Sequence, residues 1–245
     1  MKISRKRQKQ KKQEVKEDIF VQSVTGLWQK VAAVKAYVIV LAIAVLAAVI
    51  VAGFMAERKQ TVGDKGWDEL AKLEERIGKM DTATEADQEA IEDEWLEGLE
   101  GLISQTEGST VQPVIVFYYA DALFRKGGAE NVKKSEEKCR FFLEKFPKNY
   151  YAVAVKQLLG KTLFEQEKYA DALEVFQDVY DISLAEERPE MKSTKYEALY
   201  YVGRCHELLG QLQQARSTYE QLASEDVESP QWSEMARFRL SKMKS

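Results

Sequence analysis

The stretch "LLGKTLFEQEKYADALEVF" (residues 158–176) places a small residue, Gly160, ahead of Ala172 and Phe176. A second stretch, "YVGRCHELLGQLQQARSTY" (residues 201–219), repeats this outline. In each stretch, apolar residues recur at helical spacing on both sides of a short polar segment, which predicts two antiparallel helices. The small residues leave room for the two helices to approach closely. The outline therefore predicts a helix hairpin that the chain uses more than once.

In the second stretch Gly203, Ala215 and Tyr219 take the places of the three residues above. The outline resembles the tetratricopeptide repeat, in which Leu-Gly and Tyr of a first helix precede Ala, Phe and Pro of a second. The resemblance implies a solenoid of helix hairpins, whereas an unrelated helical bundle is the alternative. Its expected parts are a degenerate repeat at 67–106, repeats at 112–147, 151–184 and 195–226, and a capping helix at 230–243.

The intervals between small residues exceed the family period of about 34 residues in two places. Ala120, Gly160, Gly203 and Ala236 are separated by 40, 43 and 33 residues. We therefore expect insertions in the polar segments "KGGAENVKK" and "ISLAEERPEMKS". In the first repeat we expect Cys139 and Phe142 on the second helix.

From residue 67 onward no stretch shows sustained alternation of apolar and polar residues, so we predict an all-α domain. The predicted helices cover about 67–80, 85–105, 113–126, 132–146, 150–166, 169–183, 193–210, 212–224 and 230–243.

Residues 36–56, "AYVIVLAIAVLAAVIVAGFMA", contain no charged side chain. As a helix this block would span roughly 31 Å, about the thickness of a bilayer core, so we predict an N-terminal transmembrane helix. A buried central helix and a cleaved signal peptide are the alternatives. The apolar run is longer than a typical signal sequence, and 35 residues precede it, which favours an uncleaved anchor. The polar residues 57–66 predict a linker to the domain at 67–245.

The segment ahead of the block, residues 1–35, contains ten Lys or Arg and three Asp or Glu. Its apolar side chains recur at spacings of three and four residues, which suits an interfacial amphipathic helix or a continuation of the membrane helix. These side chains are Phe20, Val24, Leu27, Trp28 and Val31. Nucleic-acid binding by the basic run is an alternative to membrane topology and attraction to anionic lipid.

The basic tail predicts a cytoplasmic N-terminus, with the acidic repeat domain on the other side of the membrane. The basic residues that flank the span point the other way. Within about twenty residues of the span, three lysines precede it and five Lys or Arg follow it. We give the tail more weight, because large domains translocate largely regardless of charge.

The chemical inventory predicts no enzyme, no cofactor and no metal site. The chain has one His and two Cys, and it lacks phosphate-binding glycine loops and the usual hydrolase and metal motifs. We expect His206 to be a packing residue and Cys139 and Cys205 to be unpaired. The acidic runs lack the ligand spacing of a calcium-binding loop and are expected to be solvated helix faces.

Repeat stacks of this kind bind partners on a curved inner surface. In the tetratricopeptide family, that surface is lined by first-helix residues at set distances from the small residue. The resemblance implies Phe117, Asp121 and Phe124 from the first repeat, Gln157, Lys161 and Phe164 from the second, and Tyr200, Arg204 and Glu207 from the third. These aromatic and charged side chains suit an extended peptide or a partner helix, although packing between repeats explains any single aromatic equally well. Lys161 and Arg204 favour an acidic segment, unless both pair with acids inside the domain.

The combination of basic tail, single span and acidic repeat domain resembles the ancillary subunits of the bacterial Sec translocon. This resemblance implies a scaffold or adaptor for protein partners on the periplasmic face of the inner membrane, ancillary to protein translocation or envelope assembly. The alternative is a cytosol-facing, membrane-anchored repeat receptor for protein targeting or import.

Overall fold

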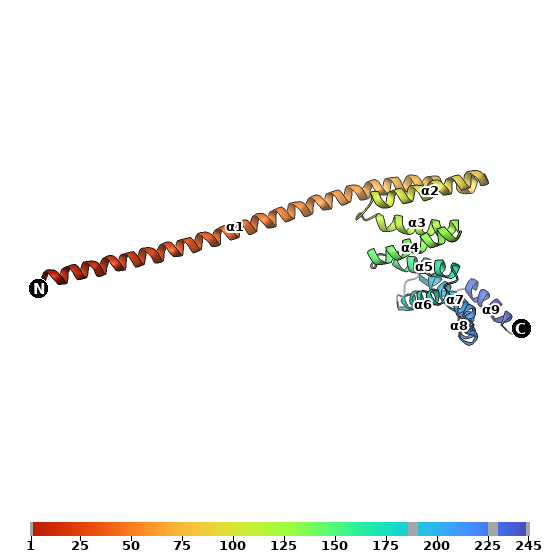
Figure 1. The fold of residues 1–245 in the computed structure, drawn as a ribbon. Helices are drawn as coiled ribbons and strands as arrows, with labels where there is room; N and C mark the ends of the chain where they lie inside the picture. Colours follow the sequence, from red (N-terminus) through yellow and green to blue (C-terminus); the bar gives the residue numbers. More distant parts are fainter. Residues whose placement is uncertain (1, 186–190, 225–229, 244–245) are drawn as a thin grey trace. The chain divides into compact units, whose positions relative to one another are not determined.

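The structure, a computed structural model, describes residues 2–185, 191–224 and 230–243, with the backbone alone for 2–36, 38, 39, 42, 81 and 86. The chain divides into two compact units, Met1–Arg58 and Lys59–Ser245. All regular elements of the described residues are helical, as predicted (Figure 1). They are α1 (Lys2–Ile77), the 3₁₀ turn η1 (Met80–Thr82), α2 (Glu85–Gln105), α3 (Gln112–Lys126), α4 (Ala129–Lys145), α5 (Ala152–Glu165), α6 (Tyr169–Ala185), α7 (Lys192–Leu208), α8 (Leu212–Ser224) and α9 (Pro230–Lys242).

Within the second unit, consecutive helices from α2 to α9 pack one against the next, and the hairpins α3–α4, α5–α6 and α7–α8 follow one another (Figure 1). The first helices of the hairpins also contact each other directly, α3 with α5, α5 with α7 and α7 with α9. Among the described residues, α4, α6 and α8 make no comparable contacts with one another. The unit is therefore an all-α helical-repeat solenoid. We call α3, α5, α7 and α9 the first-helix layer, and α4, α6 and α8 the second-helix layer.

The two hairpins quoted above close on their glycines, as the sequence predicts. A Cβ built on Gly160 would lie only 2.7 Å from Cε1 of Phe176 on the opposite helix. A Cβ on Gly203 would lie 2.5 Å from Cε1 of Tyr219. Each glycine therefore accommodates an aromatic ring that any larger residue would displace.

In each of the three hairpins, a residue with a positive φ lies in the turn between the two helices. Gly127, Glu167 and Gly210 each lie seven residues after the small residue of their repeat, and all three have a positive φ, of 71°, 60° and 74°. This left-handed conformation ends the first helix and satisfies its last carbonyl groups. It normally favours glycine, so Glu167 occupies it at a conformational cost of about 1–2 kcal/mol.

This shared turn corrects the predicted insertion in "KGGAENVKK". The second helices α4, α6 and α8 begin at Ala129, Tyr169 and Leu212, each nine residues after the small residue. No extra residue therefore lies in the first turn. Instead, α4 and α6 are 17 residues long, whereas α8 has 13. Cys139 and Phe142 lie on α4, the second helix of the first repeat, as predicted, and both are completely buried.

The predicted linker at 57–66 is helical, because α1 continues without a break to Ile77. The two glycines that suggested a linker are buried contacts. A Cβ on Gly66 would lie 2.7 Å from both Thr106 Cγ2 and Val111 Cγ1. Gly63 lies beside Thr110. Both glycines let α1 approach the connection between α2 and α3 closely.

The first hairpin, formed by the end of α1 with α2, reverses the predicted arrangement. In the predicted degenerate repeat at 67–106, the first helix would supply the small residue of the close contact, but Ala71 of α1 is exposed. The close approach is made by Gly98 of α2, where a Cβ would lie 2.7 Å from Cδ2 of Leu73. Leu70 and Leu99 form the core of this hairpin and are almost completely buried.

In the first unit, the apolar side chains described between Val40 and Met55 are all exposed. None of the helices of the described residues is long and apolar enough to cross a membrane. The predicted span includes Ala36, Val38, Ile39 and Ala42, whose side chains lie outside the described residues. The predicted interfacial segment, residues 20–31, is helical as part of α1, but its side chains also lie outside the described residues.

Candidate protein-interaction surface

Five side chains of α5 and α7 meet where these neighbouring first helices contact each other. They form what we call the α5–α7 seam: Lys161, Phe164, Glu197, Tyr201 and Arg204. The seam contains two of the predicted partner-binding cations on one layer of the stack. All five side chains are partly exposed.

One half of the seam is an ion pair between repeats. The ammonium of Lys161 lies 2.6 Å from a carboxylate oxygen of Glu197, and the exposed fractions of the two side chains are 27% and 20%. Lys161 therefore has a partner inside the domain, which is the alternative to partner binding that its sequence left open. The acid that pairs with Lys161 is Glu197. The other two acids predicted on this surface, Asp121 and Glu207, pair with Arg125 and Arg239.

The other half of the seam is aromatic and carries one cation. Phe164 and Tyr201 meet edge to face with their ring centres 5.3 Å apart. The Arg204 guanidinium lies 5.9 Å from the centre of the Phe164 ring and makes no ion pair among the described residues. Burial raises the pKa of Tyr201, and the charge of Glu197 adds to the shift. Tyr201 is therefore held in its neutral form.

Two predicted partner-binding residues offer little surface. Gln157 and Tyr200 are only 6% and 9% exposed. The Tyr200 ring packs against Tyr201, Tyr219 and Trp232. Both polar atoms of the Gln157 amide are buried and have no hydrogen-bond partner among the residues that the structure describes. Tyr200 therefore packs against the neighbouring helices, the alternative that the sequence leaves open for the aromatic residues, and Gln157 is buried.

The predicted residues of the first repeat lie on α3, apart from the seam. The Phe117 ring stacks on Tyr151 at the start of α5, with the ring centres 5.4 Å apart. Asp121 accepts from Arg125 at 2.9 Å, one turn further along the same helix. Phe124 packs, half-buried, against the adjoining core.

Glu207 belongs to the contact between the third repeat and the capping helix. It accepts a hydrogen bond from the Tyr219 hydroxyl at 2.9 Å and from Nε of Arg239 on α9 at 3.0 Å. Burial alone would raise the pKa of Glu207, but the bonds from Arg239 and Tyr219 outweigh it and lower the pKa below its ordinary value. Its side chain therefore fixes α9 to the stack.

The two cysteines and the one histidine of the chain lie in surroundings that suit a packing role. Cys139 and Cys205 are fully buried and unpaired, and burial raises the pKa of each thiol to about 12. His206 Nδ1 lies 2.6 Å from the side-chain oxygen of Gln211 in the next turn. Across the part of the chain that the structure describes, no group of three or more His, Cys, Asp or Glu is arranged to hold a metal ion.

Two residues of the seam, Glu197 and Tyr201, were not predicted. Tyr201 lies two positions before Gly203, within the window that the resemblance implies, yet the predicted residue is its neighbour Tyr200. Which of the two adjacent tyrosines faces α5 depends on the orientation of α7 about its own axis. The apolar pattern of α7 does not determine this orientation to within one residue. Glu197 lies two turns before Gly203, and no local pattern of the sequence pairs it with Lys161.

The chain matches a family model described as tetratricopeptide repeat over residues 163–237. Two similar solved structures are of a putative kinesin light chain with nearly identical TPR-like repeats from Podosopora anserina. The first is 15% identical with a TM-score of 0.56, and the match covers 70% of this chain and 84% of that one. The second is 14% identical with a TM-score of 0.54, and the match covers 70% of this chain and 85% of that one.

A third similar structure, a MamA RS-1 ArsTM double mutant, is 15% identical with a TM-score of 0.49 and covers 75% of this chain and 94% of that one. No curated protein matches the sequence. At these identities the solved structures show the fold alone. The sequence match and the hairpin geometry agree that residues 163–237 are tetratricopeptide-like repeats within a helical-repeat solenoid.

Proposed function

We propose that this chain is a non-enzymatic scaffold or adaptor whose repeat domain binds protein partners through the first-helix layer. The observation that carries the proposal is the α5–α7 seam, where Arg204 lies over the ring of Phe164 and makes no ion pair among the described residues. Within the part of the chain that the structure describes, the first helices contact each other and the second helices make no comparable contacts, which supports our proposal that the first-helix layer is the inner side of the stack. Inner surfaces of helical repeats are extended binding surfaces, and a cation above aromatic rings suits an acidic or carboxylate-bearing segment.

We further propose that residues 36–56 anchor the chain in the bacterial inner membrane. The block contains no charge, and its described apolar side chains are exposed. With the basic tail in the cytoplasm, the repeat domain lies on the periplasmic face, where an adaptor ancillary to protein translocation or envelope assembly would act.

The rival proposal is a cytosol-facing repeat receptor for protein targeting or import. It is favoured by the five Lys or Arg that follow the span within about twenty residues. Protease added outside spheroplasts separates the two proposals. Digestion of the repeat domain with a protected tail supports the periplasmic orientation, and protection of the domain supports the receptor.

The experiment for the scaffold is a capture assay on membranes washed with alkaline carbonate. The anchored chain stays in the membrane pellet and, after solubilisation in mild detergent, retains a reproducible set of partners identified by mass spectrometry. Arg204→Glu reverses the charge of the seam and is expected to reduce capture about tenfold. Lys133→Glu, on the exposed side of α4, is the matched control and should leave capture intact. Equal capture by both variants, or a soluble chain, would contradict the proposal.

A further inference from the structure

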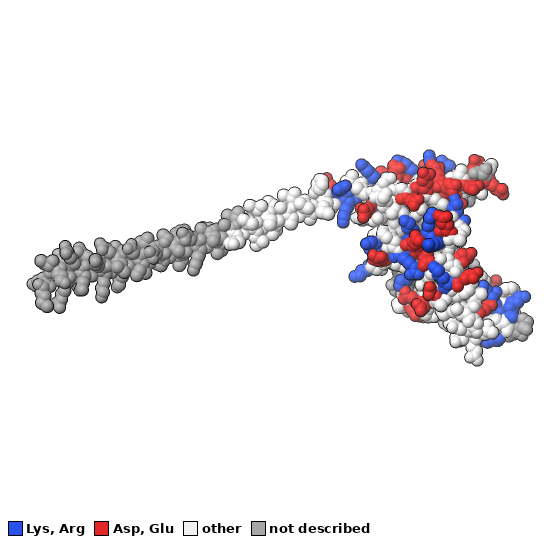
Figure 2. Space-filling model, in the orientation of Figure 1, with Lys and Arg blue, Asp and Glu red and all other residues white. Residues whose placement is uncertain are grey.

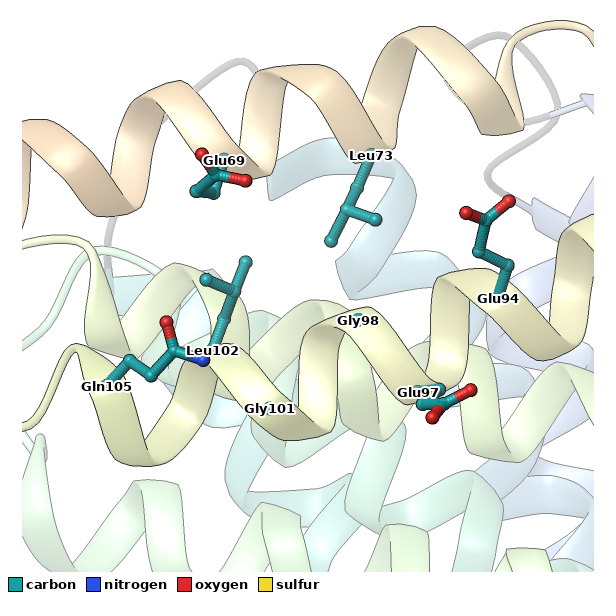
Figure 3. A pocket seen from close by; sticks show the side chains of 8 residues that line it. All are labelled: Glu69, Leu73, Glu94, Glu97, Gly98, Gly101, Leu102 and Gln105. Atoms are coloured by element: carbon teal, nitrogen blue, oxygen red, sulfur yellow. The ribbon is translucent and has the colours of Figure 1, made fainter.

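A groove of about 430 Å³ lies between the end of α1 and α2, away from the α5–α7 seam. Figure 3 shows that Glu69 and Leu73 come from α1 and that the other lining residues come from α2. Leu73 and Leu102 point into the space between the two helices (Figure 3). The remaining lining residues are Glu94, Glu97, Gly98, Gly101 and Gln105. The groove thus has an apolar interior and carboxylates on its rim.

The groove is lined by two glycines of α2, Gly98 and Gly101. Gly98 is closed over by Leu73, as described above. One turn further on, a Cβ on Gly101 would meet only Nε2 of Gln105, at 3.9 Å. In the hairpins α5–α6 and α7–α8, the space beside the glycine of the first helix is filled in the same way as that beside Gly98, by an aromatic ring of the same chain. The space beside Gly101 has room for a side chain from another molecule.

The helix that forms the groove is strongly acidic. Between Glu85 and Gln105, α2 carries eight Asp or Glu and no Lys or Arg. In Figure 2 the acidic side chains gather over this helix. Glu69 pairs with Lys72 at 2.6 Å and Glu94 pairs with Arg76, both on the exposed surface. Glu97 makes no ion pair among the described residues. Exposed ion pairs add little stability, so Lys or Arg of a partner can replace those of the chain.

We propose that the α1–α2 groove binds a cationic amphipathic segment of a partner protein. The segment inserts one bulky apolar side chain between Leu73 and Leu102, and its Lys or Arg side chains face the rim carboxylates. The charge and the apolar interior of the groove together specify this occupant. The chain's own basic tail has the charge, but residues 2–16, "KISRKRQKQKKQEVK", offer only Ile3 and Val15 as apolar side chains. This site is separate from the surface of the proposed function and does not depend on it.

The test is a titration of the full-length chain, in a nonionic detergent, with a fluorescent amphipathic helical peptide of Lys, Leu and one Trp. Wild type is expected to bind it saturably at one site. Gly101→Leu fills the groove while favouring the helix and should weaken binding about tenfold or more. Glu97→Lys should weaken it about threefold or more. The control Glu89→Lys makes the same charge change on an exposed part of α2 outside the groove and should change affinity less than about twofold.

Three results would overturn the proposal. Absence of saturable binding is the first. Equal losses for Glu97→Lys and Glu89→Lys, with Gly101→Leu unaffected, would mean that only the general charge of α2 attracts the peptide. Tight binding of the 2–16 peptide that is lost in Gly101→Leu would make the tail the occupant. If Gly101→Leu failed to fold, the two charge reversals would still decide. Arg204→Glu should leave this affinity unchanged, which separates the groove from the surface of the α5–α7 seam.

Discussion

At the scale of single residues, the pairing of a glycine with an aromatic ring determines how closely the helices of a hairpin approach. Gly160 faces Phe176 and Gly203 faces Tyr219, with no room for a Cβ. The ring atoms that would be displaced belong to side chains with no exposed surface, so they cannot move into solvent. Burial of an aromatic ring is one of the larger favourable contributions in a core, and here it requires a residue without a side chain on the opposite helix.

This pairing predicts strong coupling between the two positions. Gly160→Ala gains up to about 1 kcal/mol in helix propensity but should lose about 1–3 kcal/mol to overpacking against Phe176, so it should destabilise the full-length chain. In a Phe176→Leu background the clash is relieved, and the same substitution should be neutral or stabilising. A double-mutant cycle of chemical denaturation in nonionic detergent measures the difference.

Gly101→Ala is the control for helix propensity, because its Cβ meets open space, and it should stabilise the chain slightly. Additive effects at residues 160 and 176 would show that the helices are not in the register described above.

At the scale of elements, one buried carboxylate links successive hairpins. Glu136 of α4, only 9% exposed, accepts hydrogen bonds from Arg140 at 2.8 Å and from Gln166 and Lys168, before α6, at 2.9 and 2.8 Å. Burial would raise the pKa of Glu136, but the bonds from Lys168, Arg140 and Gln166 outweigh it and lower the pKa to about 2. The carboxylate therefore fixes the turn between α5 and α6 against the preceding repeat.

The lowered pKa predicts a specific acid sensitivity. The contribution of the Glu136 carboxylate to the free energy of unfolding should be present above pH 4.5, its unperturbed pKa, and should be lost as pH falls to about 2. Glu136→Gln should cost about 1.5–3 kcal/mol at neutral pH, and its difference from wild type should shrink through this window.

Denaturation curves of both proteins at a series of pH values give this difference. Glu165→Gln, at an exposed position of α5, is the matched control and should differ little from wild type at any pH. A gap between Glu136→Gln and wild type that is independent of pH would contradict the assignment.

The helices themselves could largely be predicted from the sequence, because a helix and its turn depend on local patterns. The predicted helices 212–224 and 230–243 agree with α8 and α9 to within one residue. The errors arise where a residue serves a contact distant in sequence. Gly63 and Gly66 predict a linker because glycine is common in turns. In the structure they instead leave room for the connection between α2 and α3, which packs against them. Likewise, the reversal in the first hairpin depends on Leu73 and Gly98 meeting, which no local pattern encodes.

At the scale of the whole molecule, the sequence predicts an all-α repeat stack, and the structure and the family match at residues 163–237 confirm that coarse architecture. The candidate surface was less predictable. Family positions place Lys161 and Arg204 on first helices, where the structure has them, but the ion pair of Lys161 with Glu197 depends on how α5 and α7 meet. The membrane anchor, its orientation and the partner remain predictions from residues 1–56 and from resemblance.

The measurement that tests the central claim most directly is site-specific photo-crosslinking in cells that express the full-length chain. A photoreactive residue at Asp121 or Arg204 probes the first-helix layer. The same residue at Lys133 or Gln177, which are exposed on α4 and α6, probes the second-helix layer. Partner binding by the first-helix layer predicts discrete adducts with the same proteins from residues 121 and 204 and none of these from 133 and 177. The same adducts from both layers, or only from the second-helix layer, would contradict it.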